Sequence, residues 1–327
     1  SSARDEYKDI TDGMLFIDAN ENPFNTNVNR YPDPQQVKLK NQLADLKGIS
    51  ENNILLGNGS DEVLDLIFRA FCEPNKDKII SLPPTYGMYA VLSNINAVEN
   101  IEIPLDLNFQ PQTIEILKAT NQHTKLLFLC SPNNPTANSF EAKKVEGLIR
   151  DFQGIVVIDE AYIDFSKEES WLSRLNEFPN LIVTQTLSKA YGLAGIRLGI
   201  CYASEDIITV LNKIKPPYNI NQLTQDKASE RLSNIKDIEN EVNIILNERE
   251  KLAAELESIP LVEIVYTSDA NFLLVRVDDA NKRYKQLIEK GIVVRNRTTQ
   301  PLCENCLRFT VGTTVENQKL IKTLKAI

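Results

Sequence analysis

TLSKAYGLAGIRLG, residues 186–199, is the stretch from which the fold of this chain can be worked out. It follows the apolar run LIV at 181–183, which is typical of a buried strand. Lys189 lies just after that run, among small and hydroxyl-bearing residues. Because burying an ammonium group costs free energy, this lysine either extends its stem to solvent or takes part in chemistry.

The length and charge of the chain limit the classes of protein to which it can belong. Its 327 residues suit one large domain with a smaller one. A net charge of −9 argues against a nucleic-acid-binding protein, which usually presents a basic face. No apolar run reaches the ~20 residues of a membrane span, and the polar start SSARDEYKDI lacks the pattern of a signal peptide. We expect a cytoplasmic protein with no membrane or nucleic-acid partner.

Cysteine and histidine are too sparse and scattered to predict a metal site. The 5 cysteines, an odd number, suit free thiols in a reducing compartment. Cys303 and Cys306 form one CxxC pair, but no second pair of ligands accompanies them. The only histidine, His123, stands alone in a polar stretch. We expect no metal, and acid–base chemistry then falls to Lys, Tyr, Asp or Glu.

Apolar runs alternate with helical patterns over the first two thirds of the chain. Runs that are apolar at almost every position suit strands buried on both faces, and they lie at 79–82, 125–130, 154–158, 181–184 and 198–203. Helical periodicity lies between them, at 61–71, 112–120 and 141–151. This alternation predicts a doubly wound α/β domain with a mostly parallel sheet.

The pattern changes near residue 227. A charged helical stretch over 227–258 precedes alternating strands at 262–267 and 271–277, a helix at 281–290, and further strands at 293–295 and 307–313. This second part predicts a smaller α+β domain. We place the large domain at 30–230, and the small domain at 231–327 together with the N-terminal segment 1–29.

Polar residues follow three consecutive predicted strands. Asn134, Asp159 and Lys189 each come within a few residues of a strand end, and Ser60 begins a helix suited to binding an anion. Ligands of open α/β sheets bind at the carboxyl ends of the strands. The sequence therefore predicts a polar ligand site at this edge.

The residue types at this edge suit pyridoxal phosphate chemistry. A desolvated lysine can form a Schiff base, and a carboxylate such as Asp159 can pair with the pyridinium nitrogen. Asn134 and Tyr162 offer hydrogen bonds for the ring oxygen. The cofactor phosphate needs a helix N-terminus, hydroxyls and an arginine. Those groups are available at Ser60, Asp61, Ser188 and Arg197.

Eight motifs give the chain a family resemblance. In order they are DANENPF (18–24), RYPDP (30–34), GNGSDEVLDLIFRAFCEP (57–74), PPTYGMY (83–89), CSPNNPTA (130–137), VVIDEAYIDF (156–165), TLSKAYGLAGIRLG (186–199) and LRFTVGT (307–313). The chain resembles the fold type I pyridoxal-phosphate aminotransferases, and among them the histidinol-phosphate aminotransferases. The resemblance implies amino transfer between L-histidinol phosphate and 2-oxoglutarate, giving imidazole-acetol phosphate and L-glutamate, in L-histidine biosynthesis.

The resemblance also implies roles for the residues around the cofactor. Lys189 would form the Schiff base and carry a proton, with Asp159 as the pyridinium partner and Tyr86 stacked on the ring. Tyr162 and Asn134 would bind the ring oxygen. The remaining cofactor-binding residues would be Ser60, Asp61, Glu62, Ser188 and Arg197, with Tyr31 reaching the phosphate from the partner subunit of a homodimer.

The substrate-binding residues are implied in the same way. Arg308 would bind the carboxylate of glutamate or the phosphate of histidinol phosphate, and Asn22 would line the entrance. Arg295 is our choice for a second anion-binding arginine, with Arg297 as the alternative. Ala137 departs from the family, which has glycine after NNPT, and a positive φ there would cost about 1 kcal/mol.

Other functions remain open on the sequence alone. Aromatic aminotransferases and threonine-phosphate decarboxylases share most of these motifs. A cofactor-binding protein without turnover is a second alternative, but the intact set of site residues argues against it. A dinucleotide-dependent dehydrogenase is rejected because GNGSDE lacks the third glycine of the expected fingerprint.

Overall fold

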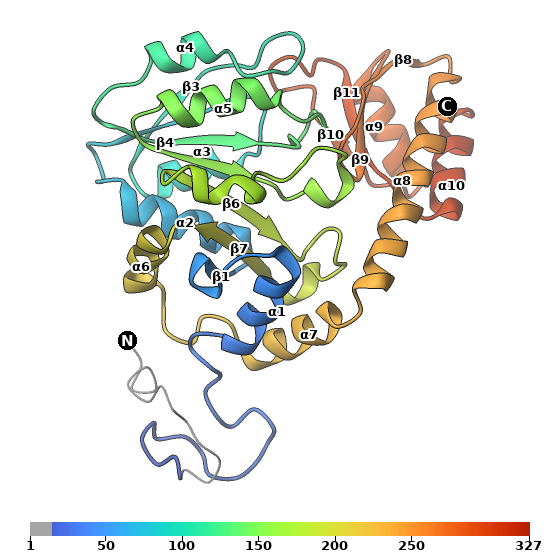
Figure 1. Ribbon diagram of the computed structural model, residues 1–327. Helices are drawn as coiled ribbons and strands as arrows, with labels where there is room; N and C mark the ends of the chain where they lie inside the picture. Colours follow the sequence, from blue (N-terminus) through green and yellow to red (C-terminus); the bar gives the residue numbers. More distant parts are fainter. Residues whose placement is uncertain (1–14) are drawn as a thin grey trace.

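Two sheets organise the computed structural model, which describes residues 15–327 (Figure 1). The larger sheet has seven strands in the order β1-β7-β6-β5-β4-β2-β3, and the smaller has four in the order β10-β11-β9-β8. The predicted α/β fold class is confirmed. Of the predicted N-terminal segment 1–29, residues 1–14 lie outside the described part of the chain.

The large sheet is mostly parallel. Its strands are β1 (Ile54–Asn58), β2 (Lys78–Ser81), β3 (Glu99–Glu102), β4 (Thr124–Cys130), β5 (Ile155–Asp159), β6 (Leu181–Thr186) and β7 (Leu198–Ala203). The pairs from β3 through β2, β4, β5 and β6 are parallel, whereas β7 runs antiparallel to both of its neighbours, β6 and β1. The carboxyl ends of β4, β5 and β6 therefore meet at one edge of the sheet.

Helices cover both faces of this sheet, which explains why its central strands are apolar throughout. On one face α1 (Val37–Lys47) and α5 (Ala142–Asp151) share a hydrophobic core with Leu127 and Leu129 of β4. On the opposite face α2 (Ser60–Phe71), α3 (Met88–Ile95) and α6 (Glu205–Ile214) share a second hydrophobic core with Leu126 and Phe128. The shorter helical segments are η2 (Glu51–Asn53), α4 (Thr113–Lys118), η3 (Ile163–Phe165), η4 (Trp171–Glu177) and η5 (Ala194–Ile196).

The small sheet is antiparallel and lies beside the large one (Figure 1). Its strands are β8 (Val262–Val265), β9 (Phe272–Val277), β10 (Arg295–Asn296) and β11 (Cys306–Thr310). One face packs against α8 (Ile235–Glu257), α9 (Ala280–Glu289) and α10 (Thr314–Leu324). Residues of the other face, among them Phe272 and Leu274, join the core of the large sheet, so that face is directed at the predicted site.

The predicted helix at 227–258 is wrong as a single element. The chain forms α7 (Gln222–Leu232) and then α8, with Ser233 and Asn234 between them. The Ser233 hydroxyl donates to the carbonyl of Ser229 at 3.0 Å, and Asn234 has non-helical backbone angles. Short polar side chains compete in this way for the backbone bonds of a helix. The predicted domain boundary at 230/231 falls in the last turn of α7 and stays a prediction.

None of the helices in residues 15–327 combines the length and apolar character that crossing a bilayer requires.

Ala137 adopts the backbone conformation that its family glycine would favour. Its φ is +68°, and the residue is fully buried. Its N–H donates to the carbonyl of Asn133 at 2.8 Å, and its carbonyl accepts from the N–H of Asp269 at 2.7 Å. Those two bonds hold the loop after Asn134 in place even though alanine is strained there.

The Ala137→Gly variant should have nearly the same stability as the parent chain. Relief of the left-handed conformation gains about 1 kcal/mol, and loss of one buried methyl group costs about the same. Thermal unfolding of both proteins would measure the difference. A gain or loss well above 1 kcal/mol would show that one of the two effects dominates.

Candidate active site

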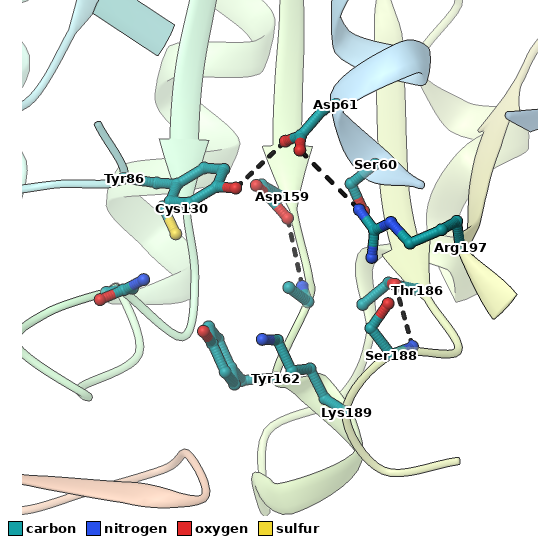
Figure 2. A pocket seen from close by; sticks show the side chains of 12 residues that line it. Ser60, Asp61, Tyr86, Cys130, Asp159, Tyr162, Thr186, Ser188, Lys189 and Arg197 are labelled. Atoms are coloured by element: carbon teal, nitrogen blue, oxygen red, sulfur yellow. Dashed lines mark hydrogen bonds and ion pairs between the residues drawn. The ribbon is translucent and has the colours of Figure 1, made fainter. Parts of the chain in front are cut away.

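A cavity lies where β4, β5 and β6 end and α2 begins (Figure 2). Open α/β sheets bind their ligands at such an edge. The cavity brings together many of the residues predicted for the site. The residues that line it are Ser60, Asp61, Tyr86, Cys130, Asn134, Asp159, Ala161, Tyr162, Thr186, Ser188, Lys189 and Arg197.

Asp159 is the buried carboxyl group of the cavity, only 3% exposed at the end of β5. The Tyr89 hydroxyl donates to its Oδ2 at 2.8 Å, and the Ala161 N–H donates to its Oδ1 at 3.2 Å. Burial raises the pKa of Asp159, and both hydrogen bonds oppose that rise because they favour the ionised carboxylate. A cationic group bound in the cavity would stabilise the same ionised form.

Lys189 is the amine of the cavity. Its Nζ lies 5.7 Å from the centre of the Tyr162 ring, and Figure 2 shows both side chains pointing into the cavity. Desolvation lowers the pKa of Lys189, and the positive charges of Arg308 and Arg197 lower it further, against the opposing effect of Asp159. A larger share of this lysine is therefore free amine near neutral pH, as a nucleophile or proton carrier requires.

The start of α2 forms an anion-binding end of the cavity, since backbone N–H groups at a helix N-terminus attract negative charge. Two glycines let the turn before α2 lie close to β7 and to the Arg197 side chain. A Cβ on Gly199 would lie 2.4 Å from Ser60 N, and one on Gly59, whose φ is +82°, would lie 2.6 Å from Arg197 Nη2. Figure 2 shows Ser60, Ser188 and Arg197 on the same side of the cavity.

Asp61 links two of the predicted cofactor residues. Its Oδ1 accepts a hydrogen bond from the Tyr86 hydroxyl at 3.1 Å, and its Oδ2 lies 3.9 Å from Arg197 Nη2. The ion pair is about half exposed, so it contributes little and leaves Arg197 able to turn toward a bound anion. The Tyr86 ring meets the Tyr89 ring edge-on, with centroids 5.7 Å apart.

Asn134 connects the large sheet with the small one. Arg308 Nη1 of β11 donates to Asn134 Oδ1. The Arg308 guanidinium lies 5.1 Å from the centre of the Phe272 ring, and that ring packs edge-on against Tyr162, also at 5.1 Å. Arg295 pairs with Arg308 across the antiparallel β10–β11 ladder. The two predicted substrate-binding arginines thus share one face of the small sheet, beside the cavity.

Five predicted site residues do not line the cavity: Arg295 and Arg308, which lie beside it on the small sheet, and Glu62, Asn22 and Tyr31. Glu62 Oε2 accepts from the N–H of Asn58 and, at 2.8 Å, from Asn219 Nδ2, so this carboxylate fixes the turn between β1 and α2. Asn22 lies on the segment before α1, where its Oδ1 accepts from the N–H of Phe24 at 3.0 Å. Tyr31 lies on the same segment, where its ring stacks on that of Tyr218.

Sequence reasoning missed four residues of the site. Three of them line the cavity at the strand ends: Cys130, Ala161 and Thr186. The fourth, Tyr89, does not line the cavity but donates a hydrogen bond to Asp159. Tyr89 stands in the motif PPTYGMY, three residues after Tyr86. Its place in the same motif as Tyr86 was the available signal.

Comparison with known proteins identifies the class. The family model described as aminotransferase class I and II matches residues 17–324. The chain therefore belongs to the class I and II aminotransferases.

Relatives within this class narrow the family. A histidinol-phosphate aminotransferase of Flavobacterium johnsoniae is 66% identical over 328 residues, which cover 100% of this chain and 94% of the relative. The chain is thus a member of the histidinol-phosphate aminotransferase family.

Solved structures of low identity show the same fold. That of a histidinol-phosphate aminotransferase from Clostridium acetobutylicum has a TM-score of 0.85 at 24% identity, covering 92% of this chain and 91% of that one. That of a histidinol-phosphate aminotransferase from Sinorhizobium meliloti, in complex with pyridoxal-5'-phosphate, has a TM-score of 0.83 at 24% identity. It covers 92% of this chain and 83% of that one.

The Tyr89→Phe variant should lose activity on the acid side of its pH profile. The hydrogen bond from the Tyr89 hydroxyl opposes the rise in the pKa of Asp159, so its removal raises that pKa further. When the pH is lowered, the variant therefore loses the ionised carboxylate at a higher pH than the parent enzyme does. The expected loss in kcat/KM is about tenfold, since a hydrogen bond to a charged group contributes about 1.5–3 kcal/mol.

Tyr202→Phe is the matched control for this experiment. Tyr202 is buried in β7, and its hydroxyl has no hydrogen-bond partner among the described residues. Its removal should leave the pH profile of kcat/KM unchanged. Identical profiles for Tyr89→Phe and the parent enzyme would show that Tyr89 does not set the charge of Asp159.

Proposed function

We propose that this chain transfers the amino group of L-histidinol phosphate to 2-oxoglutarate, with pyridoxal 5'-phosphate as cofactor. The products are imidazole-acetol phosphate and L-glutamate, so the reaction belongs to L-histidine biosynthesis. One observation carries the proposal: a single cavity joins the amine of Lys189, the buried carboxylate of Asp159 and the start of α2. The 66% identity to a histidinol-phosphate aminotransferase supports the choice of substrate.

The residues around the cavity suit both the ring nitrogen and the phosphate of the cofactor. Asp159 would pair with the protonated ring nitrogen. The phosphate would be held by Ser60, Ser188 and Arg197. Gly59 and Gly199 have no side chains that would crowd this end of the cavity. When bound, the cofactor supplies an electron sink that stabilises negative charge at the substrate Cα.

The other side chains of the cavity would orient the reactants and move protons. Lys189, with its lowered pKa, would hold the resting cofactor covalently and, once displaced by the substrate amine, carry a proton from the substrate Cα to the cofactor C4′. Asn134 and Tyr162 would donate to the ring oxygen, and Tyr86 would cover the ring face. Asn134 also accepts a hydrogen bond from Arg308, so this residue would couple the orientation of the cofactor ring to the position of the small sheet.

Substrate choice would depend on the small sheet. We assign Arg308 and Arg295 to the anionic group of the substrate, because they face one another across β10 and β11 beside the cavity. An aromatic aminotransferase or a threonine-phosphate decarboxylase could use the same cofactor residues. The decarboxylase would release carbon dioxide instead of passing the amino group to 2-oxoglutarate.

We also propose a homodimer in which each chain completes the other's site. Leu15, Ile17 and Phe24 are 81%, 85% and 78% exposed on a segment that extends away from both sheets (Figure 1). Tyr31, on this segment, stacks on Tyr218 with ring centroids 4.6 Å apart and does not line its own chain's cavity. Apolar side chains of this kind need a partner surface.

A cytoplasmic location remains our proposal. The 5 cysteines are free, buried thiols, which supports a reducing compartment. Fractionation of the producing cell would test it.

Mixing the cofactor-loaded enzyme with L-histidinol phosphate should convert the absorbance of the lysine-bound cofactor to that of its amino form in one turnover. Addition of 2-oxoglutarate should restore the first spectrum and release L-glutamate. The Lys189→Ala variant should lack both the initial absorbance and turnover. Turnover in that variant would refute the role of Lys189. A normal starting spectrum that L-histidinol phosphate leaves unchanged would show that the enzyme acts on a related compound instead.

Mixing two impaired variants should raise activity above that of either one if Tyr31 serves the partner's cavity. Tyr31→Phe chains lack the hydroxyl, and Lys189→Ala chains lack the amine, so a mixed dimer has one site with both groups intact. The homodimers would be measured alone, and again after joint refolding. An absence of recovered activity, with mixed dimers present by mass spectrometry, would place Tyr31 at its own chain's site or at none.

A further inference from the structure

Asn219, in the segment between α6 and α7, is bonded to both ends of the turn that begins α2. Its Nδ2 donates to Glu62 Oε2 at 2.8 Å and to the carbonyl of Leu56 at 3.1 Å. Glu62 Oε2 also accepts from the N–H of Asn58. Leu56 and Asn58 belong to β1, and Glu62 belongs to the first turn of α2. One side-chain amide therefore fixes the end of β1 relative to the start of α2.

The position of the Glu62 carboxylate matters to any anion that binds at the start of α2. Glu62 lies two residues after Ser60, which lines the cavity, but it does not line the cavity itself. A carboxylate that turned toward the cavity would repel a phosphate and compete for the backbone N–H groups that attract it. The hydrogen bonds that Glu62 accepts from Asn219 and Asn58 hold its carboxylate out of the cavity.

The same side chain is connected to the segment that carries Tyr31. Asn219 Oδ1 accepts from Lys215 Nζ at 3.1 Å, and Lys215 Nζ also donates to the carbonyl of Pro34 at 3.2 Å. Tyr218, next to Asn219 in the chain, stacks on Tyr31 and has a φ of +56°. A bulky residue is strained in this left-handed conformation, and such strain persists only where surrounding contacts enforce it. Continuous contacts therefore join the turn before α2 to the segment of Tyr31.

We propose that Asn219 is a positioning residue for the phosphate of the cofactor. Through Glu62 it sets the turn at which the phosphate binds, and through Lys215 it fixes that turn relative to the segment of Tyr31. Asn219 does not line the cavity, so it acts only through the residues that it holds. The inference rests on the proposed function, because it assumes that the phosphate of pyridoxal 5'-phosphate binds at the start of α2.

Two ligands that differ by the phosphate group separate this role from a merely structural one. The whole chain, freed of cofactor, would be titrated with pyridoxal 5'-phosphate and with pyridoxal, and the absorbance of the Lys189-bound ligand would report binding. In the Asn219→Ala variant the Kd for pyridoxal 5'-phosphate should rise at least about tenfold, as expected when a hydrogen bond to a charged group is lost. The Kd for pyridoxal should change less than about threefold, because pyridoxal lacks the group that the turn would hold.

Two further variants keep the outcome interpretable. Asn219→Leu has a similar branched shape and adds no charge, so it tests the same hydrogen bonds if Asn219→Ala folds poorly. Asn212→Ala is the matched control, because Asn212 lies on α6 and its Oδ1 has no hydrogen-bond partner within residues 15–327. The control should bind both ligands as the parent chain does.

The titrations give distinct results if the inference fails. Equal weakening of both ligands by the Asn219 variants, or unchanged binding of pyridoxal 5'-phosphate, would overturn the role of Asn219. A parent chain that binds neither ligand at Lys189 would instead overturn the proposed function.

Discussion

The burial of one carboxylate, that of Asp159, is the constraint around which the site is built. An ionised carboxylate out of water is stable only with hydrogen-bond donors or a cation beside it. Tyr89 and Ala161 supply the donors, and the open side of the carboxylate faces the cavity. Because β5 lies between β4 and β6, the residues that follow those two strands, Asn134 and Lys189, flank Asp159 from either side. The strand order thus decides which groups can meet a ligand there.

The central part of this arrangement could be predicted from the sequence because it depends on parallel neighbours. β4, β5 and β6 are consecutive in the chain and adjacent in the sheet, so polar residues after each strand converge without any knowledge of distant contacts. Their apolar runs predicted buried strands, and the burial on both faces agrees. The sequence left the backbone conformation of Ala137 open, and the structure shows that its φ is positive, as a glycine would favour.

Features that depend on partners far apart in the sequence could not be predicted in this way. Tyr89 binds a carboxylate seventy residues away, and no local pattern indicates that contact. The side of the sheet on which Arg295 lies follows from the register of β10 and β11, which one sequence leaves open. The edge strand β3 has the polar sequence ENIE and gives no apolar signal. The roles assigned to Tyr31 and Asn22 concern a second chain or an entrance, and remain proposals.

The loop after Asn134 has an evolutionary consequence. At Ala137 the strain of a left-handed backbone and the packing of a buried methyl group oppose each other with similar size. Exchange between alanine and glycine at this position should therefore be nearly neutral for stability. Gly199 has no comparable freedom, because any side chain would collide with the backbone of Ser60. Two small residues at one site are thus under very different selection.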